Sequence, residues 1–282
     1  MSEKRIKIVG WGVAIAVAAA AAVASPAMTQ ERPGYRDTPM QPDGRWRIHD
    51  PDRPYPTVVT PGAVPGAPPS DAVVLFDGTS LDAWQPQRGP WTLQDGVMTV
   101  PPRGPGGNEN SLVSKQSFGD VQLHLEFRSP YPPQRSSQDR GNSGILFMQR
   151  YEVQILDAYD NATYADGTVG AIYGWKPPLV NPSRPPGAWQ TYDIVFERPR
   201  FAADGSVARP AYVTVFLNGV LVQNRQPYPG TTVWRRVARY EPHGDAAPIQ
   251  LQDHDSAVSF RNIWVRPLPE TALSHDPTGA VR

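Results

Sequence analysis

The sequence predicts an all-β domain, a jelly-roll sandwich of two antiparallel sheets, on three observations. Apolar and polar residues alternate with a period of two in several short segments, and Asp-Gly or Asn-Gly pairs mark turns beside them. No stretch of twelve or more residues within the domain shows a convincing helical stripe. A domain of about 200 residues built from many short strands suits a jelly roll better than a seven-stranded immunoglobulin-type fold.

The N-terminus has the pattern of a secretory signal. Three basic residues precede an apolar run over residues 8–24, and small residues such as Ala24 and Ala27 provide cleavage sites. We therefore expect residues 1–27 to be a signal peptide and the protein to be exported, either to the periplasm or outside the cell. The alternative is an uncleaved N-terminal anchor, because an apolar run of about 17 residues is near the short limit for crossing a bilayer.

The composition excludes several kinds of site and partner. The chain has no cysteine, which rules out disulfides, thiolate metal sites and a cysteine nucleophile. Its 27 basic and 27 acidic residues balance, so no electrostatic argument favours nucleic acid. We expect membrane contact only through an uncleaved N-terminal segment.

The domain boundaries follow from composition. Residues 28–70 are rich in Pro, Gly, Asp and Arg without a periodic apolar pattern, which predicts a Pro-rich, poorly packed linker. Trp46 and Tyr55 docking onto the domain is the alternative. From residue 71 short apolar runs alternate with turn residues, so we expect one domain over residues 71–270 and a tail over 271–282.

The strands can be read from the alternation in order along the chain. Residues 121–128 and 191–197 each place apolar side chains on one face, and Asn218-Gly219 predicts a tight hairpin within residues 212–222. Asp77-Gly78, Asp95-Gly96 and Asp204-Gly205 mark further turns. The residues expected to point inward are Leu123, Leu125, Ile194, Phe196, Val213, Val215 and Leu217.

Three segments place polar side chains where a buried strand is expected. They are Gly141-Asn-Ser-Gly-Ile145, Tyr151-Glu-Val-Gln-Ile-Leu-Asp157 and Leu251-Gln-Asp-His254. Because charges normally occupy the wet face of a strand, this pattern indicates that one sheet face is a polar binding surface. We expect the chemistry there.

The chain resembles the 3-keto-disaccharide hydrolase domain family over residues 73–268. Besides the three polar segments, the motifs that carry the resemblance in order are Leu75-Phe-Asp-Gly-Thr-Ser-Leu-Asp-Ala-Trp84, Phe118-Gly-Asp120, Gly170-Ala-Ile-Tyr173, Pro186-Gly-Ala-Trp189, Leu217-Asn-Gly-Val220 and Phe260-Arg-Asn-Ile263. The resemblance implies a concanavalin-A-like jelly roll that cleaves glycosides whose sugar carries a ketone at carbon 3. Gln190, Gln250 and Asp255 depart from the family pattern.

The chemistry of such a substrate defines what the site needs. A C3 ketone acidifies the hydrogen on C2, so a base can remove it, the enolate can expel the glycosidic oxygen, and water can then add. The site needs a base near C2, an electrophile on the ketone oxygen and an acid near the leaving oxygen. No cofactor is certain, and a divalent metal ion with unknown ligands is one candidate for the electrophile.

Glu152, His254 and Asp157 are the catalytic candidates. Glu152 shares a strand face with Gln154, and a structural salt bridge is the alternative for it. His254 is a candidate because histidine is the side chain most easily poised as an acid or base, with a backbone-bonded turn histidine as its alternative. Asp157 ends the strand and would reach the cleft through the loop that follows.

Further residues are candidates for substrate binding. Asn142 and Ser143 lie in a Gly-flanked loop, Tyr173 and Trp175 offer aromatic faces, and Gln252 precedes His254. The complete predicted binding set is Asn142, Ser143, Gln154, Tyr173, Trp175, Gln252 and Glu126. For Glu126 a structural ion pair is an equal alternative. Inserts over residues 131–140 and 228–245 are expected to rim the cleft.

The resemblance therefore implies a hydrolase or lyase that acts on 3-keto-glycosides, with a small carbohydrate as its partner. The alternative is a carbohydrate-binding module that shares the sandwich without catalysis, and a cell-surface interaction protein is a third reading. A paired acid and base favours the enzyme, since a binding module needs aromatics and amides only.

Overall fold

The computed structural model describes residues 32–102 and 109–269. The expected signal peptide, the first residues of the linker and the expected tail lie outside the described residues. The chain divides into two compact units at residue 57. In the first unit the described residues form turns with one isolated bridge between Met40 and Arg47, and Arg36 pairs with Asp52.

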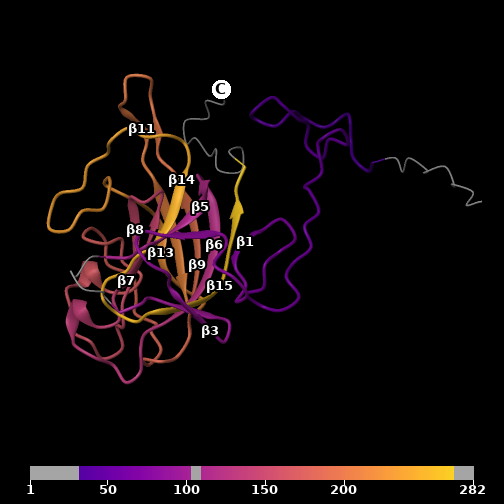
Figure 1. Ribbon diagram of the computed structural model, residues 1–282. Coiled ribbons are helices and arrows are strands. Elements are labelled where there is room, and N and C mark those ends of the chain that lie inside the picture. The colour runs from indigo at the N-terminus through magenta and orange to yellow at the C-terminus, as the bar shows by residue number, and fades with distance from the viewer. Residues whose placement is uncertain (1–31, 103–108, 270–282) are drawn as a thin grey trace, which may run out of the picture. The chain divides into compact units, whose positions relative to one another are not determined.

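The second unit contains two antiparallel sheets, which confirms the predicted sandwich (Figure 1). Within the described residues the larger sheet has eight strands, with the order β13-β12-β9-β6-β15-β4-β3 and β1 also paired with β15. Their bounds are β1 Val73–Phe76, β3 Thr92–Gln94, β4 Val97–Thr99, β6 Val121–Arg128, β9 Gln190–Glu197, β12 Tyr212–Leu217, β13 Val220–Pro227 and β15 Ser259–Pro267.

The smaller sheet has five strands in the order β2-β5-β14-β7-β8. Their bounds are β2 Trp84–Pro86, β5 Leu112–Phe118, β14 Ala247–Leu251, β7 Ser143–Phe147 and β8 Tyr151–Ile155. A separate short pair joins β10 (Arg200–Phe201) to β11 (Val207–Arg209). The helical elements of the described residues are the 3-10 turns Ser137–Asp139 and Ala165–Gly167, so none is long and apolar enough to cross a membrane.

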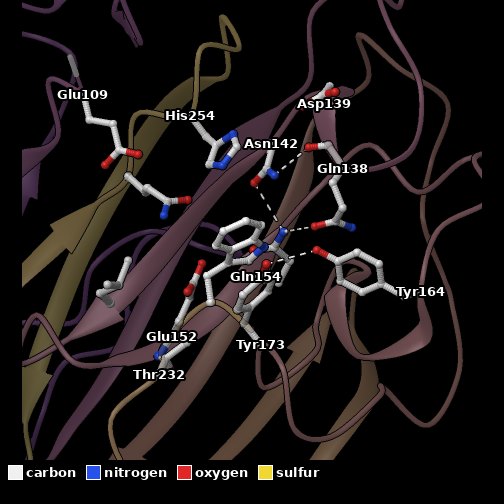
Figure 2. Close-up of a pocket in the computed structure, with 13 residues that line it drawn as sticks. Glu109, Gln138, Asp139, Asn142, Glu152, Gln154, Tyr164, Tyr173, Thr232 and His254 are labelled. Carbon is white, nitrogen blue, oxygen red and sulfur yellow. Dashed lines mark hydrogen bonds between the residues drawn. The ribbon is translucent and has the colours of Figure 1, made fainter. Parts of the chain in front are cut away.

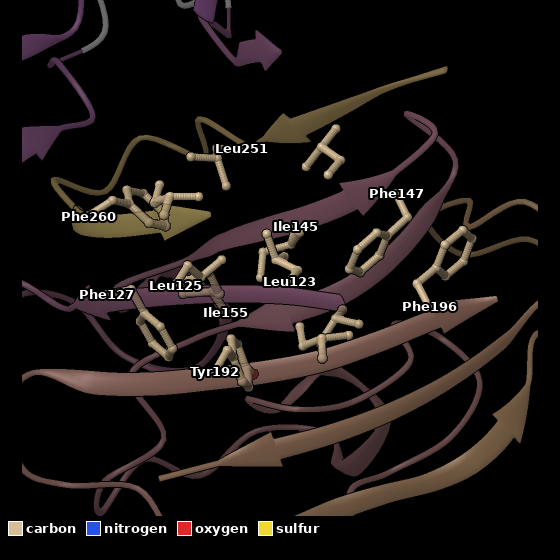
Figure 3. Packing of buried hydrophobic residues seen from close by; sticks show 14 of the residues in the cluster. Leu123, Leu125, Phe127, Ile145, Phe147, Ile155, Tyr192, Phe196, Leu251 and Phe260 are labelled. Atoms are coloured by element: carbon tan, nitrogen blue, oxygen red, sulfur yellow. The ribbon is translucent and has the colours of Figure 1, made fainter. Parts of the chain in front are cut away.

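The core fills the space between the two sheets (Figure 3). All seven residues expected to point inward are at most 1% exposed. Phe147 of β7 stacks on Phe196 of β9 with ring centroids 4.6 Å apart, so this pair joins the smaller sheet to the larger one. Burying each ring contributes about 1.5–3 kcal/mol, so this contact stabilises the packing of β7 on β9.

Local turn chemistry explains the predicted hairpin. Asn218 and Gly219 both have positive φ, at 52° and 78°, which is the geometry of a two-residue turn between β12 and β13. This turn sets the register between β12 and β13, in which Leu217 lies opposite Val220.

The end of the Pro-rich segment is better packed than its composition predicts. The Gly66 carbonyl accepts hydrogen bonds from Asn262 Nδ2 and Trp264 Nε1, both at 2.9 Å. A Cβ at Gly66 would lie 3.2 Å from the His124 ring, and its φ is +82°. An aperiodic segment has no face for a core to bury, but its backbone carbonyls can still bind side chains of β15, which sequence periodicity does not detect.

Candidate active site

Strand β8 places two polar side chains on the face of the smaller sheet that points away from the core. Val153 and Ile155 point into the core, so Glu152 and Gln154 point to the opposite face, as the alternation predicted. Across the ladder, Gly144 lies opposite Gln154 and Leu146 opposite Glu152. The Gln252 backbone N–H donates to the Gly144 carbonyl at 2.9 Å, which adds a third strand to the polar surface.

This surface is covered although β8 is the edge strand of its sheet. The segment after the second 3-10 turn continues the ladder, because Gln154 N donates to Ala171 O and Gly170 N to Gln154 O, both at 3.0 Å. The second insert approaches the same open edge of β8, where Thr232 Oγ1 accepts from the Glu152 backbone N–H at 3.1 Å. All five residues of β8 are consequently buried.

A cavity of about 560 Å³ opens above the polar face (Figure 2). Glu152 and His254 both line it, together with Asn142, Gln154, Tyr173 and Gln252 from the predicted set. The remaining lining residues are Glu109, Gln138, Asp139, Leu146, Tyr164, Thr232 and Trp234. The two inserts supply Gln138, Asp139, Thr232 and Trp234, so they form part of the cavity wall.

Glu152 is the most perturbed carboxyl group in this cavity. It is 6% exposed, and burial, with the nearby negative charge of Glu109 as a smaller cause, raises its pKa from an ordinary 4.5 to about 8. Gly144 leaves room for the Glu152 carboxyl group, since a Cβ at residue 144 would lie 2.5 Å from Glu152 Oε1. The glycine is therefore required for space and not for an unusual φ.

The orientation of the Gln154 amide depends on the protonation state of Glu152. With Nε2 directed at Asn142 Oδ1, 3.3 Å away, the amide oxygen faces the Glu152 carboxyl group and suits a protonated acid. Exchanging the amide atoms lets Nε2 donate to Glu152 Oε1 and to the Ser143 carbonyl, both at 3.1 Å, which suits the carboxylate. We favour the exchanged arrangement, because the first leaves the amide oxygen facing the Ser143 carbonyl as well as the Glu152 carboxyl group.

Asp253 holds the loop that presents His254. Its buried carboxylate accepts from the backbone N–H of Asn110 and of Asp255, each at 2.8 Å. Within residues 32–102 and 109–269, the imidazole of His254 has no hydrogen-bond partner and is partly buried at the cavity wall. The ring is thus available to a bound molecule.

Three predicted site residues lie elsewhere. Asp157 was expected to be catalytic, but it does not line the cavity, because strand parity directs it away from the face that carries Glu152. Its carboxylate instead pairs with Arg140 Nε at 2.8 Å. The Ser143 hydroxyl donates to the Gln252 carbonyl at 2.7 Å and is fully buried, so it joins strands and cannot bind sugar. Glu126 is on β6 of the other sheet, where Arg261 Nη2 pairs with it at 2.6 Å.

Trp175 lies beside the main cavity and not in it. It lines an adjoining cavity that shares Tyr164, Tyr173 and Trp234 with the first. The Tyr164 and Tyr173 hydroxyls are 3.0 Å apart, and burial raises the pKa of the Tyr173 phenol well above its usual value. Tyr173 therefore stays protonated and can donate a hydrogen bond into the site.

Several lining residues were not predicted from the sequence. Glu109, Tyr164, Thr232 and Trp234 lie in turns and loops without periodicity, and the only signal for the last two was their position in a polar insert. In the part of the chain that the structure describes, no group of three or more His, Asp or Glu side chains is arranged to hold a metal ion.

A carbohydrate-active jelly roll is the class that this fold and cavity define. The model of the 3-keto-alpha-glucoside-1,2-lyase-like domain matches residues 71–266, and the chain belongs to this family. The membership supports a carbohydrate-active function in general terms.

Solved structures agree with this assignment. A protein described as a proposed glycosyl hydrolase from Parabacteroides distasonis is 44% identical, with a TM-score of 0.71 over 76% of this chain and 93% of that chain. A second protein of the same description and organism is 19% identical, with a TM-score of 0.51 over 70% of this chain and 94% of that one, and shows the fold alone. The comparison with curated proteins gave no match.

Proposed function

We propose that this protein cleaves the glycosidic bond of 3-keto-glycosides by elimination followed by hydration. The observation that carries the proposal is Glu152, a buried carboxyl group with a raised pKa that lines the same polar cavity as His254. Membership of a 3-keto-alpha-glucoside-1,2-lyase-like family supports the substrate class.

The reaction takes place in two stages. A base takes the proton from C2, and the C–H electron pair forms the enolate of the C3 ketone. The enolate then forms a C1–C2 double bond as the C1–O bond breaks, and the departing oxygen takes a proton. Water adds across the double bond, with its oxygen on C1 and a proton on C2, to give the free 3-keto sugar.

Glu152 is the proposed base. A pKa of about 8 makes its carboxylate a stronger base than an ordinary one, at the cost that roughly one molecule in ten is ionised at pH 7. Gln154 stabilises that ionised form when its amide turns to donate to Glu152 Oε1 at 3.1 Å. The amide is therefore a positioning group for the base.

His254 and Tyr173 are proposed for the two remaining tasks. A protonated His254 donates to the departing glycosidic oxygen, because its imidazole is not bonded to the described part of the protein. Tyr173 donates to the ketone oxygen as the enolate forms, since burial keeps its phenol protonated. Neither task requires an oxocarbenium ion.

The test compares oxidised and parent substrates. Purified protein is incubated with 3-keto-trehalose and with trehalose, with and without chelator, and released sugar is measured. We expect turnover of the keto sugar only, and a loss of about two to four orders of magnitude in kcat for Glu152→Gln. Glu126→Gln is the matched control, since it makes the same change on the other sheet. Equal cleavage of trehalose contradicts the proposal, and tight binding without turnover favours a binding module.

We also propose that the protein works after export. The basic start, apolar run and small residues of the first 27 positions support this location. Fractionation of cells that express the full chain, with N-terminal sequencing of the exported form, tests it. Intact protein confined to the cytoplasm contradicts it.

A further inference from the structure

A second cavity of about 670 Å³ adjoins the proposed catalytic one. Tyr164, Tyr173 and Trp234 line both cavities, so the two spaces meet at these three side chains. A glycoside with its sugar beside Glu152 would therefore extend past the tyrosine pair into the second space. The bond to be broken would lie near that boundary.

The walls of the second cavity differ in character from those of the first. Trp175 is 53% exposed and Trp234 is 66% exposed, and Val237 adds a further exposed apolar surface. Large apolar side chains gathered around one hollow indicate a binding surface. Indole faces bind flat rings through offset stacking, so an aromatic group is one that this space can hold.

The charges of the two cavities are also opposite. Glu109 and Asp139 line the first beside Glu152, which is mostly protonated at pH 7, whereas Arg235 and Arg236 line the second together with one acid, Asp166. In the described residues neither arginine forms a salt bridge, and the Arg235 guanidinium lies 5.3 Å from the centre of the Trp234 ring. An anionic group would thus be attracted to the second cavity and repelled from the first.

We propose that the second cavity is the leaving-group subsite, and that it takes an aromatic aglycone bearing a negative charge, such as a carboxyphenyl group. The inference rests on the proposed function, because it places the sugar in the first cavity. It explains why the two cavities differ in charge. The acidic lining accepts a neutral sugar, and the arginines hold the anionic ring so that the substrate binds in one direction only.

The first experiment measures substrate preference. The 3-keto-α-glucosides of 4-hydroxybenzoate and of 4-(hydroxymethyl)phenol are matched in size and differ in charge. We expect wild-type kcat/KM to favour the carboxylate by about fivefold or more, and the double variant Arg235→Gln/Arg236→Gln to lower this ratio to about one. A ratio near one in the wild type, with both substrates cleaved, overturns the subsite and leaves the proposed function intact.

The second experiment needs no catalysis. Binding of free 4-hydroxybenzoate is followed by calorimetry and by quenching of tryptophan fluorescence in wild-type protein, in the double arginine variant and in Trp175→Ala. We expect saturable binding in the wild type, and about three- to tenfold weaker binding in each variant. Circular dichroism checks that the variants are folded. Binding that is absent, or equal in all three proteins, overturns the subsite, whereas inactivity on both glucosides with intact binding counts against the proposed function alone.

Discussion

Replacing Glu152 by Gln should change how stability depends on pH, since Gln has the shape of the protonated acid and never ionises. In the unfolded chain Glu152 has its ordinary pKa of 4.5, whereas in the folded protein burial raises the pKa to about 8. Below 4.5 both states hold the proton. Between these values only the folded state keeps it, so the free energy of unfolding falls as pH rises, and the loss is complete above about 8.

The size of the effect follows from the two pKa values. The difference between 4.5 and about 8, at about 1.4 kcal/mol per pH unit, amounts to about 5 kcal/mol as an upper limit. Urea unfolding of wild type and Glu152→Gln, followed by tryptophan fluorescence at pH 4.5, 6.5 and 9, measures it. Other titrating groups cancel in the difference between the two proteins. We expect the variant to gain stability relative to wild type by several kcal/mol between pH 4.5 and 9, and a constant difference would refute the reasoning.

Four further predictions address catalysis and packing. In His254→Ala, where the proposed acid is absent, kcat/KM on a 3-keto-glucoside should rise with pH with its midpoint near 8; a fall over that range would make Glu152 an acid. Deuterium at C2 should slow kcat if proton removal limits the rate, with the effect unchanged in Glu126→Gln. Gly144→Ala should cost about 1–3 kcal/mol in urea unfolding and lower kcat at least tenfold, because its Cβ would lie 2.5 Å from Glu152 Oε1; full activity would show that the carboxyl group moves freely. Phe196→Ala should cost about 3–5 kcal/mol through loss of the Phe147 stack, measured the same way, and under 1 kcal/mol would contradict its place in the core.

Strand periodicity correctly predicted which side chains share a face of a strand. It did not predict which sheet each strand belongs to. The period of two correctly placed Glu152 and Gln154 together, since alternate positions share a face whatever the strand packs against. The same rule places Glu126 on a polar face but does not say which sheet that face belongs to, and β6 lies in the other sheet. Local alternation has no information on strand order, which is set by packing between segments distant in sequence.

The sequence also did not predict the contacts that loops bring about between side chains. Asp157 and Arg140 are 17 residues apart and meet only because the first insert folds back beside the end of β8. Trp175 was correctly expected in a loop, but the loop directs it into the adjoining cavity. These contacts depend on turns whose geometry is set by tertiary structure, so composition predicts that such residues are exposed without predicting what they face.

The burial that raises the pKa of Glu152 comes from the aperiodic part of the chain. An edge strand such as β8 would leave an outward carboxylate in water, and there its pKa would be ordinary. Residues 170–172 continue the ladder along the outer edge of β8, and Thr232 bonds the Glu152 backbone farther along the same edge. The sandwich therefore fixes where the carboxyl group points, whereas the covering loops determine its basicity, and the second insert also carries Trp234, Arg235 and Arg236 to the adjoining cavity. A change in that insert should alter the pH dependence and the aglycone preference together, because one segment controls both.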